Sequence, residues 1–243
     1  MTLMIHRVRA INEPGSVNPV HDDEFARRLG FQGGLVPGAT VYGYVAVVPE
    51  RHWGDAWRSA GTMSARFLQP FYDGEEVTVT AVESEGGLDL EARNPAGELC
   101  ATGRATPSSV EPAPVVDRYP APSLPAERRA PVFVPGEALG ALETTLRLEP
   151  AWPARLGNEV LMANVQLPPW IHVETRTRHL ASVRDGEPVE VRALVAAAWE
   201  RRGHRFVDLD VLVIGEAGRP LAQIRHIAIT ELAQLRDRAS EAG

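Results

Sequence analysis

One histidine stands in a loop whose residue types could carry chemistry. His21 follows Asn18-Pro19-Val20 in the stretch GSVNPVHDDEFARRLGF, which covers residues 15–31. Proline restricts the backbone of the residue before it, and an imidazole that titrates near neutral pH often moves protons in catalysis. The stretch therefore predicts a rigid loop in which His21 could exchange a proton with water, and Ser16 lies two residues before Asn18.

Three carboxylates are candidates for the missing partner of His21. Asp22 and Asp23 open the segment DDEFARRLG, where acidic side chains usually cap a helix and complement its dipole. Capping is the favoured interpretation for both, and catalysis is the alternative. Glu159 lies in a segment that we predict to be a second central helix, from which it could reach a shared groove.

Composition narrows the classes of function. The net charge of −7 argues against nucleic acid or an anionic membrane as partner. All 25 basic residues are arginine, which excludes chemistry by a lysine nucleophile. The sequence contains no glycine loop of the Walker or dinucleotide type. The histidines outside the loop lack metal-ligand spacing, so we expect no cofactor and no metal, and we expect ordinary structural roles for His172, His179, His204 and His226.

The sequence also indicates a compartment. It has one cysteine, no apolar run long enough to cross a bilayer, and an N-terminal segment without the apolar core of a signal peptide. These features predict a soluble cytoplasmic protein.

Two parts of the chain align with each other. ARFLQPFYDGEEVTV (65–79) matches TRHLASVRDGEPVEV (177–191) without gaps, at an offset of 112 residues. GELCATGRA (97–105) matches GRPLAQIRH (218–226) at an offset nine residues larger, and a longer hairpin around WERRGHRF accounts for those nine residues. The pattern predicts an internal duplication.

A proline-rich stretch, TPSSVEPAPVVDRYPAPSLPAERRAPVFVP, separates the two copies. Proline at this density blocks helices and sheet ladders and favours extended chain. We therefore predict a first unit over residues 1–106, a connector over 107–135 and a second unit over 136–243.

Each unit has the same predicted order of elements. A long apolar segment (38–50 in the first unit, 153–167 in the second) predicts a helix wrapped by a sheet. Three segments of alternating apolar and polar residues follow it, as is typical of half-buried antiparallel strands. The predicted fold class is α+β: a double hotdog, in which two antiparallel sheets form one continuous sheet and each wraps a central helix.

The segment from Ser16 to about Tyr44, NPVHDDEFARRLGF…GGLVPGATVYG, resembles the signature of the MaoC-like (R)-specific enoyl-thioester hydratases and dehydratases. That signature is a D-x-N-P-x-H loop, a helix, a Gly-Phe, and a His-Gly that opens the central helix. The resemblance implies that His21 acts as base beside Asn18, and that the Gly38 amide binds the thioester carbonyl. Ser16 replaces the family's aspartate and Pro37 its second histidine. Serine can orient a water but cannot hold a proton near neutral pH.

The resemblance implies a lyase that acts on 2-enoyl or 3-hydroxyacyl thioesters of coenzyme A or an acyl carrier protein. The altered site leaves two alternatives. One is a non-catalytic acyl-binding or partner subunit. The other is a repurposed thioester enzyme of secondary metabolism, which would catalyse cyclisation or hydrolysis or act as a polyketide-type dehydratase. A homodimer, or a heteromer with another hotdog chain, is a possible assembly. The matching loop of the second unit, Ala130–Phe133, has no imidazole, so we expect at most one site per chain.

Overall fold

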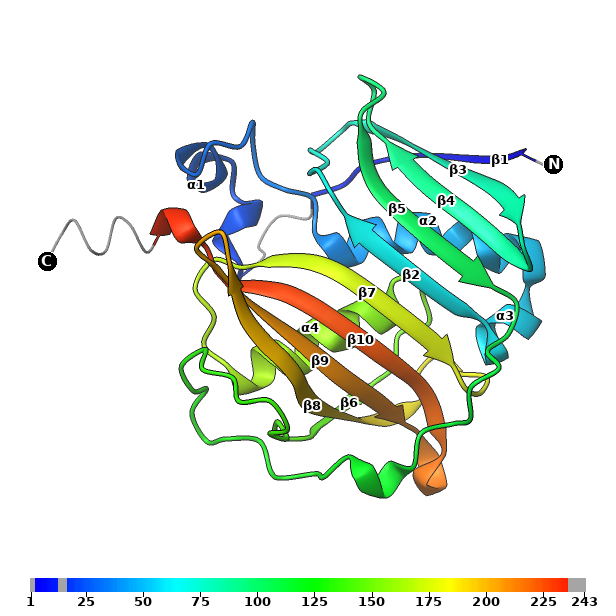
Figure 1. Ribbon diagram of the computed structural model, residues 1–243, viewed down its shortest axis with the longest axis vertical. Coiled ribbons are helices and arrows are strands. Elements are labelled where there is room, and N and C mark those ends of the chain that lie inside the picture. The colour runs from blue at the N-terminus through cyan, green and yellow to red at the C-terminus, as the bar shows by residue number, and fades with distance from the viewer. Residues whose placement is uncertain (1–2, 13–16, 236–243) are drawn as a thin grey trace, which may run out of the picture.

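The computed structural model describes residues 3–12 and 17–235, whose strands form one ten-stranded sheet (Figure 1). Every pair of neighbouring strands in it is antiparallel. The strands are β1 Leu3–Arg9, β2 Thr62–Phe67, β3 Glu76–Ser84, β4 Gly87–Arg93, β5 Leu99–Thr106, β6 Leu142–Thr145, β7 Ile171–His179, β8 Pro188–Arg201, β9 His204–Ile214 and β10 Pro220–Glu231. The helices are α1 Asp23–Arg28, α2 Gly38–Trp53, α3 Asp55–Ala60 and α4 Trp152–Asn164, with short 3-10 turns at Pro19–His21, Val116–Arg118 and Glu216–Gly218.

The sheet has a mirrored strand order about its centre. Its order is β1-β3-β4-β5-β2-β7-β10-β9-β8-β6, so each strand before the β2–β7 pair has a counterpart at the same distance after it. β3 and β8 begin 112 residues apart, and β5 and β10 begin 121 residues apart, which are the two offsets of the sequence repeat. The continuous sheet predicted from the repeat is therefore present.

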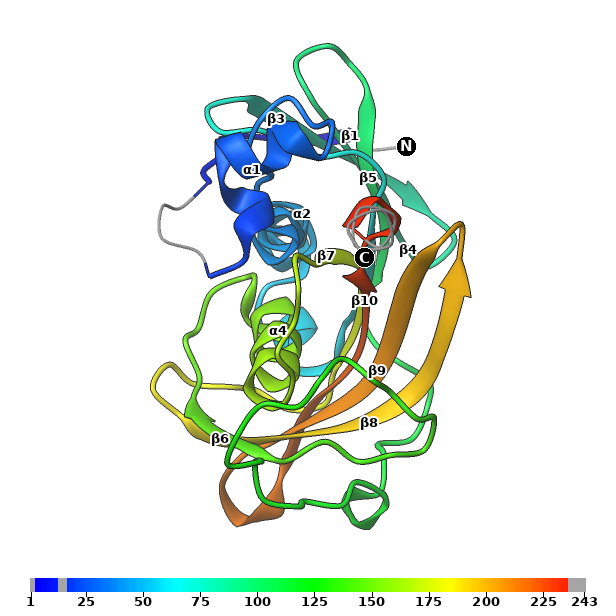
Figure 2. The ribbon, with the colours of Figure 1, turned by 90° about the vertical axis from the view of Figure 1, so that its left-hand side faces the viewer.

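The two long helices lie on the concave side of the curved sheet, side by side (Figure 2). α2 is apolar on most of its surface, because it packs against strands on one side and α4 on the other. Gly43 permits the close approach of the helices, since a Cβ atom there would lie 3.1 Å from the Cβ of Ala151. Each unit thus has its own apolar core around its own helix.

The two units meet at the antiparallel pair β2–β7. Pairing runs from Thr62 opposite Arg178 to Arg66 opposite Glu174 and ends there. β7 begins three residues before Glu174, at Ile171, so this part of the strand has no partner in β2. We call the β2–β7 pair the seam. At the amino end of β7 the seam is open, because the first residues of β7 have no hydrogen-bonded partner in β2.

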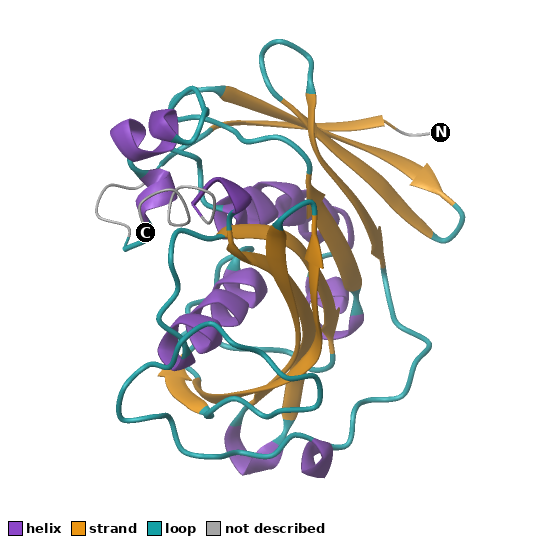
Figure 3. Ribbon diagram, turned by 60° about the vertical axis from the view of Figure 1, so that its left-hand side comes forward, coloured by secondary structure: helices purple, strands orange, loops and turns teal. Residues whose placement is uncertain are grey.

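The connector runs outside the sheet as a long loop (Figure 3). Tyr119 anchors it, because its ring is buried with Leu212 and Ile214. Arg178 also holds it, since the guanidinium donates hydrogen bonds to the carbonyl oxygens of Glu111 and Pro112. The division into a first unit over 1–106, a connector over 107–135 and a second unit over 136–243 stays a prediction.

The second unit has the longer hairpin that the sequence repeat predicted. β8 and β9 have 14 and 11 residues, while their counterparts β3 and β4 have 9 and 7. Residues Trp199 to Phe206 belong to this extension and have no counterpart in the shorter β3–β4 hairpin of the first unit. Among the described residues, no helix combines the length and apolar character needed to span a bilayer.

Candidate functional site

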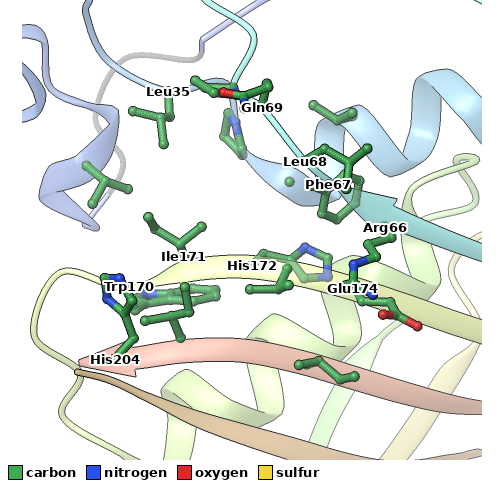
Figure 4. Close-up of a pocket in the computed structure, with 18 of the residues that line it drawn as sticks. Leu35, Arg66, Phe67, Leu68, Gln69, Trp170, Ile171, His172, Glu174 and His204 are labelled. Atoms are coloured by element: carbon green, nitrogen blue, oxygen red, sulfur yellow. The ribbon is translucent and has the colours of Figure 1, made fainter. Parts of the chain in front are cut away.

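A cavity of about 750 Å³ lies at the open end of the seam, with walls from both units (Figure 4). The first unit contributes the His21 loop, the start of α2 and the end of β2. The second contributes the start of β7, the end of β10 and the tip of the β8–β9 hairpin. Apolar and aromatic side chains dominate the interior, among them Leu35, Phe67, Phe71, Trp170 and Ile171, as is usual for sites that bind small molecules.

Asn18 fixes the loop that carries His21. Its side chain is buried, and its Nδ2 donates to the carbonyl oxygen of Trp170 at 2.8 Å, in the other unit. Its Oδ1 accepts from the backbone amides of Val20 and Trp170, both at 3.4 Å. Because both ends of this amide are engaged with backbone, we assign Asn18 a positioning role rather than a chemical one.

His21 has a defined tautomer when it is neutral. Its Nδ1 lies 2.6 Å from the carbonyl oxygen of Leu35, which can only accept, so Nδ1 carries the proton. The remaining nitrogen, Nε2, is then a free base. Burial lowers the pKa of His21 below its ordinary value, and the bond to Leu35 opposes this shift only in part. The imidazole is therefore mainly neutral at pH 7.

Gly38 begins α2 in the same cavity, and Pro37 is the residue before it. The first amides of a helix have no partner within the helix and lie at the positive end of its dipole. A Cβ atom at Gly38 would lie 2.9 Å from both Cβ and Nδ1 of His172, so only glycine fits beside that ring. The structure thus brings His21 and Gly38 to one cavity.

The three alternative carboxylates do not line the cavity. Asp22 caps α1 by accepting from the amide of Phe25, and Asp23 accepts from the amide of Gly34 and from Arg27. Glu159 is half-buried, which raises its pKa, while Arg155 and Arg147 oppose the shift. Its neighbour Asn158 faces the cavity instead, since successive helical residues point about 100° apart.

The position of Ser16 lies outside the described residues. Within the described part of the chain, the cavity is lined by one carboxylate, that of Glu174 on β7. Its side chain is buried and paired with Arg176. Sequence analysis missed Glu174 because the strand position shows no motif, and only the β2–β7 pairing brings it to the cavity.

His172 is a second residue that sequence analysis did not assign to the site. It lines the cavity beside Gly38, contacts Phe67 edge-on at 4.9 Å, and bonds through Nε2 to the Thr175 hydroxyl at 2.7 Å. No described residue provides a hydrogen-bond partner for its buried Nδ1. Burial and the neighbouring His226 ring hold its pKa well below the usual range, so it is neutral. The ordinary structural role expected for His172 stays a prediction, and its ring lies where a Cβ atom of Gly38 would point.

No family model and no curated protein matches the chain. Similar solved structures include a candidate thioesterase II from Thermobifida fusca YX (17% identity, 94% of this chain and 92% of that one, TM-score 0.55). They also include the Rv0216 double hotdog protein of Mycobacterium tuberculosis (14%, 86% of both chains, 0.57) and a candidate MaoC-domain dehydratase from Chloroflexus aurantiacus J-10-fl (12%, 95% of both, 0.59). The predicted double hotdog fold is confirmed, and it is the fold of dehydratases and thioesterases alike.

Proposed function

We propose that this double hotdog chain is a hydratase or dehydratase that adds water to, or removes it from, a 2-enoyl/3-hydroxyacyl thioester. One observation carries the proposal: the free Nε2 of a neutral His21 and the amide end of α2 at Gly38 belong to the walls of one cavity. The apolar walls around Phe67 and Trp170 suit an acyl chain. The thioester-acting neighbours on the same fold support the substrate class.

Hydration needs a base for water, a donor for the enolate oxygen and a proton for the α-carbon. His21 Nε2 takes a proton from water while the hydroxide oxygen bonds to the β-carbon. The electrons of the double bond move toward the thioester oxygen, where the Gly38 amide and the α2 dipole stabilise the negative charge. The imidazolium then returns the proton to the α-carbon, so the atoms of one water are added and His21 is restored.

This route needs no carboxylate to exchange protons. The carbonyl of Leu35 holds the His21 ring and stabilises its protonated form. Because one imidazole both removes and returns the proton, hydroxyl and hydrogen arrive on the same face of the double bond. Ser16 is left with the task of orienting the water.

The proposal is tested with crotonyl-CoA, by following loss of the enoyl absorbance. The wild-type protein is expected to hydrate it, and His21→Ala to reduce kcat/KM by about 10²–10⁴-fold, the usual contribution of a positioned acid or base. His6→Ala is the matched control, because His6 lies on the edge strand β1 outside the cavity.

Two results contradict the proposal: release of free coenzyme A thiol as the main reaction, or tight acyl-CoA binding with no turnover in the wild type. The Ser16→Asp variant distinguishes a site that has lost a needed carboxylate from a site that works without one. We expect little gain in hydration, since His21 carries the proton alone. A gain of a hundredfold or more would instead show that a second proton carrier is needed.

A further inference from the structure

The extended β8–β9 hairpin places arginine side chains at the cavity. Arg201 and Arg202 at its tip line the cavity, together with Arg66 and Arg176 from the two seam strands. Glu174 is the one carboxylate among the lining residues that the structure describes, and it pairs with Arg176. The remaining three arginines form no ion pair with any described residue. On a chain of net charge −7, these arginines concentrate positive charge locally, which favours anions.

The same hairpin carries an aromatic platform. The rings of Trp199 and Phe206 stack with an interplanar angle of 7° and a centroid distance of 5.2 Å. Both rings line the cavity, and Trp199 remains 38% exposed. A large exposed aromatic side chain beside arginines is suited to stacking with a planar base, while arginine binds phosphate.

The backbone at the hairpin tip supports a role beyond turn formation. Arg202 and Gly203 both have positive φ, of 52° and 77°, at the two-residue turn between β8 and β9. Glycine, asparagine or aspartate is favoured at such positions, and an arginine there is strained. The tip is also fixed in place, because His204 Nδ1 accepts from the amide of Ala233 at 3.1 Å. In Figure 1 this tip lies beside the end of β10, on the same side as α1.

We propose that the β8–β9 hairpin binds the nucleotide end of coenzyme A. Arg201 and Arg202 bind its phosphates, Trp199 stacks on its adenine, and the pantetheine thioester reaches inward to His21. The inference rests on the proposed function for the acyl end and names the carrier. The aromatic platform favours coenzyme A over an acyl carrier protein, since a carrier offers the pantetheine phosphate without a base to stack.

The test compares two crotonyl thioesters, one on coenzyme A and one on N-acetylcysteamine, which lacks the nucleotide. In the double variant Arg201→Gln/Arg202→Gln, kcat/KM for crotonyl-CoA is expected to fall roughly ten- to hundredfold, while that for the N-acetylcysteamine thioester stays unchanged. Trp199→Ala is expected to show the same selectivity. The matched control is Arg205→Gln, because Arg205 is on the same hairpin but pairs with Glu231 and does not line the cavity.

Calorimetric titration with coenzyme A itself separates this inference from the proposed function. If neither thioester is hydrated but coenzyme A binds the wild type and loses about tenfold or more in affinity in the double variant, the inference holds and the hydratase proposal fails. If both thioesters are hydrated equally well and the double variant changes neither, the inference is overturned and the hydratase proposal stands. Turnover of a crotonyl-loaded acyl carrier protein that coenzyme A does not inhibit would also overturn it.

Discussion

At the scale of single residues, Gly38 meets two constraints: it begins α2 in the cavity wall, and a Cβ atom added to it would meet His172. The Gly38→Ala variant forces the added methyl to within 2.9 Å of the His172 ring and Cβ, so the helix start or the ring must move. We expect a loss of roughly 1–3 kcal/mol in the free energy of unfolding, typical of overpacking. Hydration of crotonyl-CoA should fall at least about tenfold, since it depends on the position of this amide.

Gly43→Ala is the control for this prediction. It adds the same methyl to the same helix at a crowded contact with Ala151, but outside the cavity. Equilibrium unfolding should detect strain in both variants, whereas activity measured on fully folded protein should fall only for Gly38→Ala. An equal loss of activity in both variants would mean that hydration does not depend specifically on the position of the Gly38 amide.

At the scale of elements, the His21 loop depends on the other unit for its position. In Asn18→Ala the carbonyl of Trp170 loses the amide donor 2.8 Å away, in a buried setting. The unsatisfied group should cost about 1–3 kcal/mol of folding free energy. The kcat should fall because the loop that carries His21 loses its anchor, although the His21 side chain itself is unchanged. The matched Asn94→Ala also removes a side chain with two hydrogen bonds, both to Glu98, but it lies outside the cavity and should leave kcat unchanged. An unchanged kcat in Asn18→Ala would show that the loop needs no anchor.

The elements differ in how far the sequence predicts them. The strands β3 to β5 and β8 to β10 alternate apolar and polar residues over seven or more positions, and they are the three strands that were predicted to follow the central helix of each unit. No range was predicted for β1, β2, β6, β7 or α3: β1 and β6 are the edge strands, and α3 has only six residues. His172 and Glu174 could not be placed in the cavity from the sequence, because the end of β2–β7 pairing decides where they lie.

At the scale of the whole molecule, three histidines are buried between the helices and the sheet. Burial lowers the pKa of His226 to about 3 and of His179 to about 4, and that of His172 lies well below its ordinary value. In the unfolded chain these histidines bind protons at about pH 6.5, whereas in the folded chain they stay neutral to a much lower pH. The free energy of unfolding therefore falls as the pH drops below about 6.5. At pH 5, His226 alone should cost roughly 2 kcal/mol relative to pH 7.

Urea unfolding at a series of pH values measures this loss. His226→Leu removes a ring whose two nitrogens have no hydrogen-bond partner among the described residues. The variant should therefore flatten the decline between pH 7 and 5. An equally steep decline in His226→Leu would place the acid sensitivity elsewhere.

The mirrored strand order has a consequence for how the two copies can diverge. Both copies contribute residues to the walls of one cavity, so a substitution in one copy can change the binding of a substrate that also contacts the other. Fusion into a single chain means that the copies need not stay alike, as they must when two identical subunits assemble. One copy can keep the reactive groups while the other acquires an extension that binds the distant end of the substrate. Neither copy alone would then bind the whole substrate.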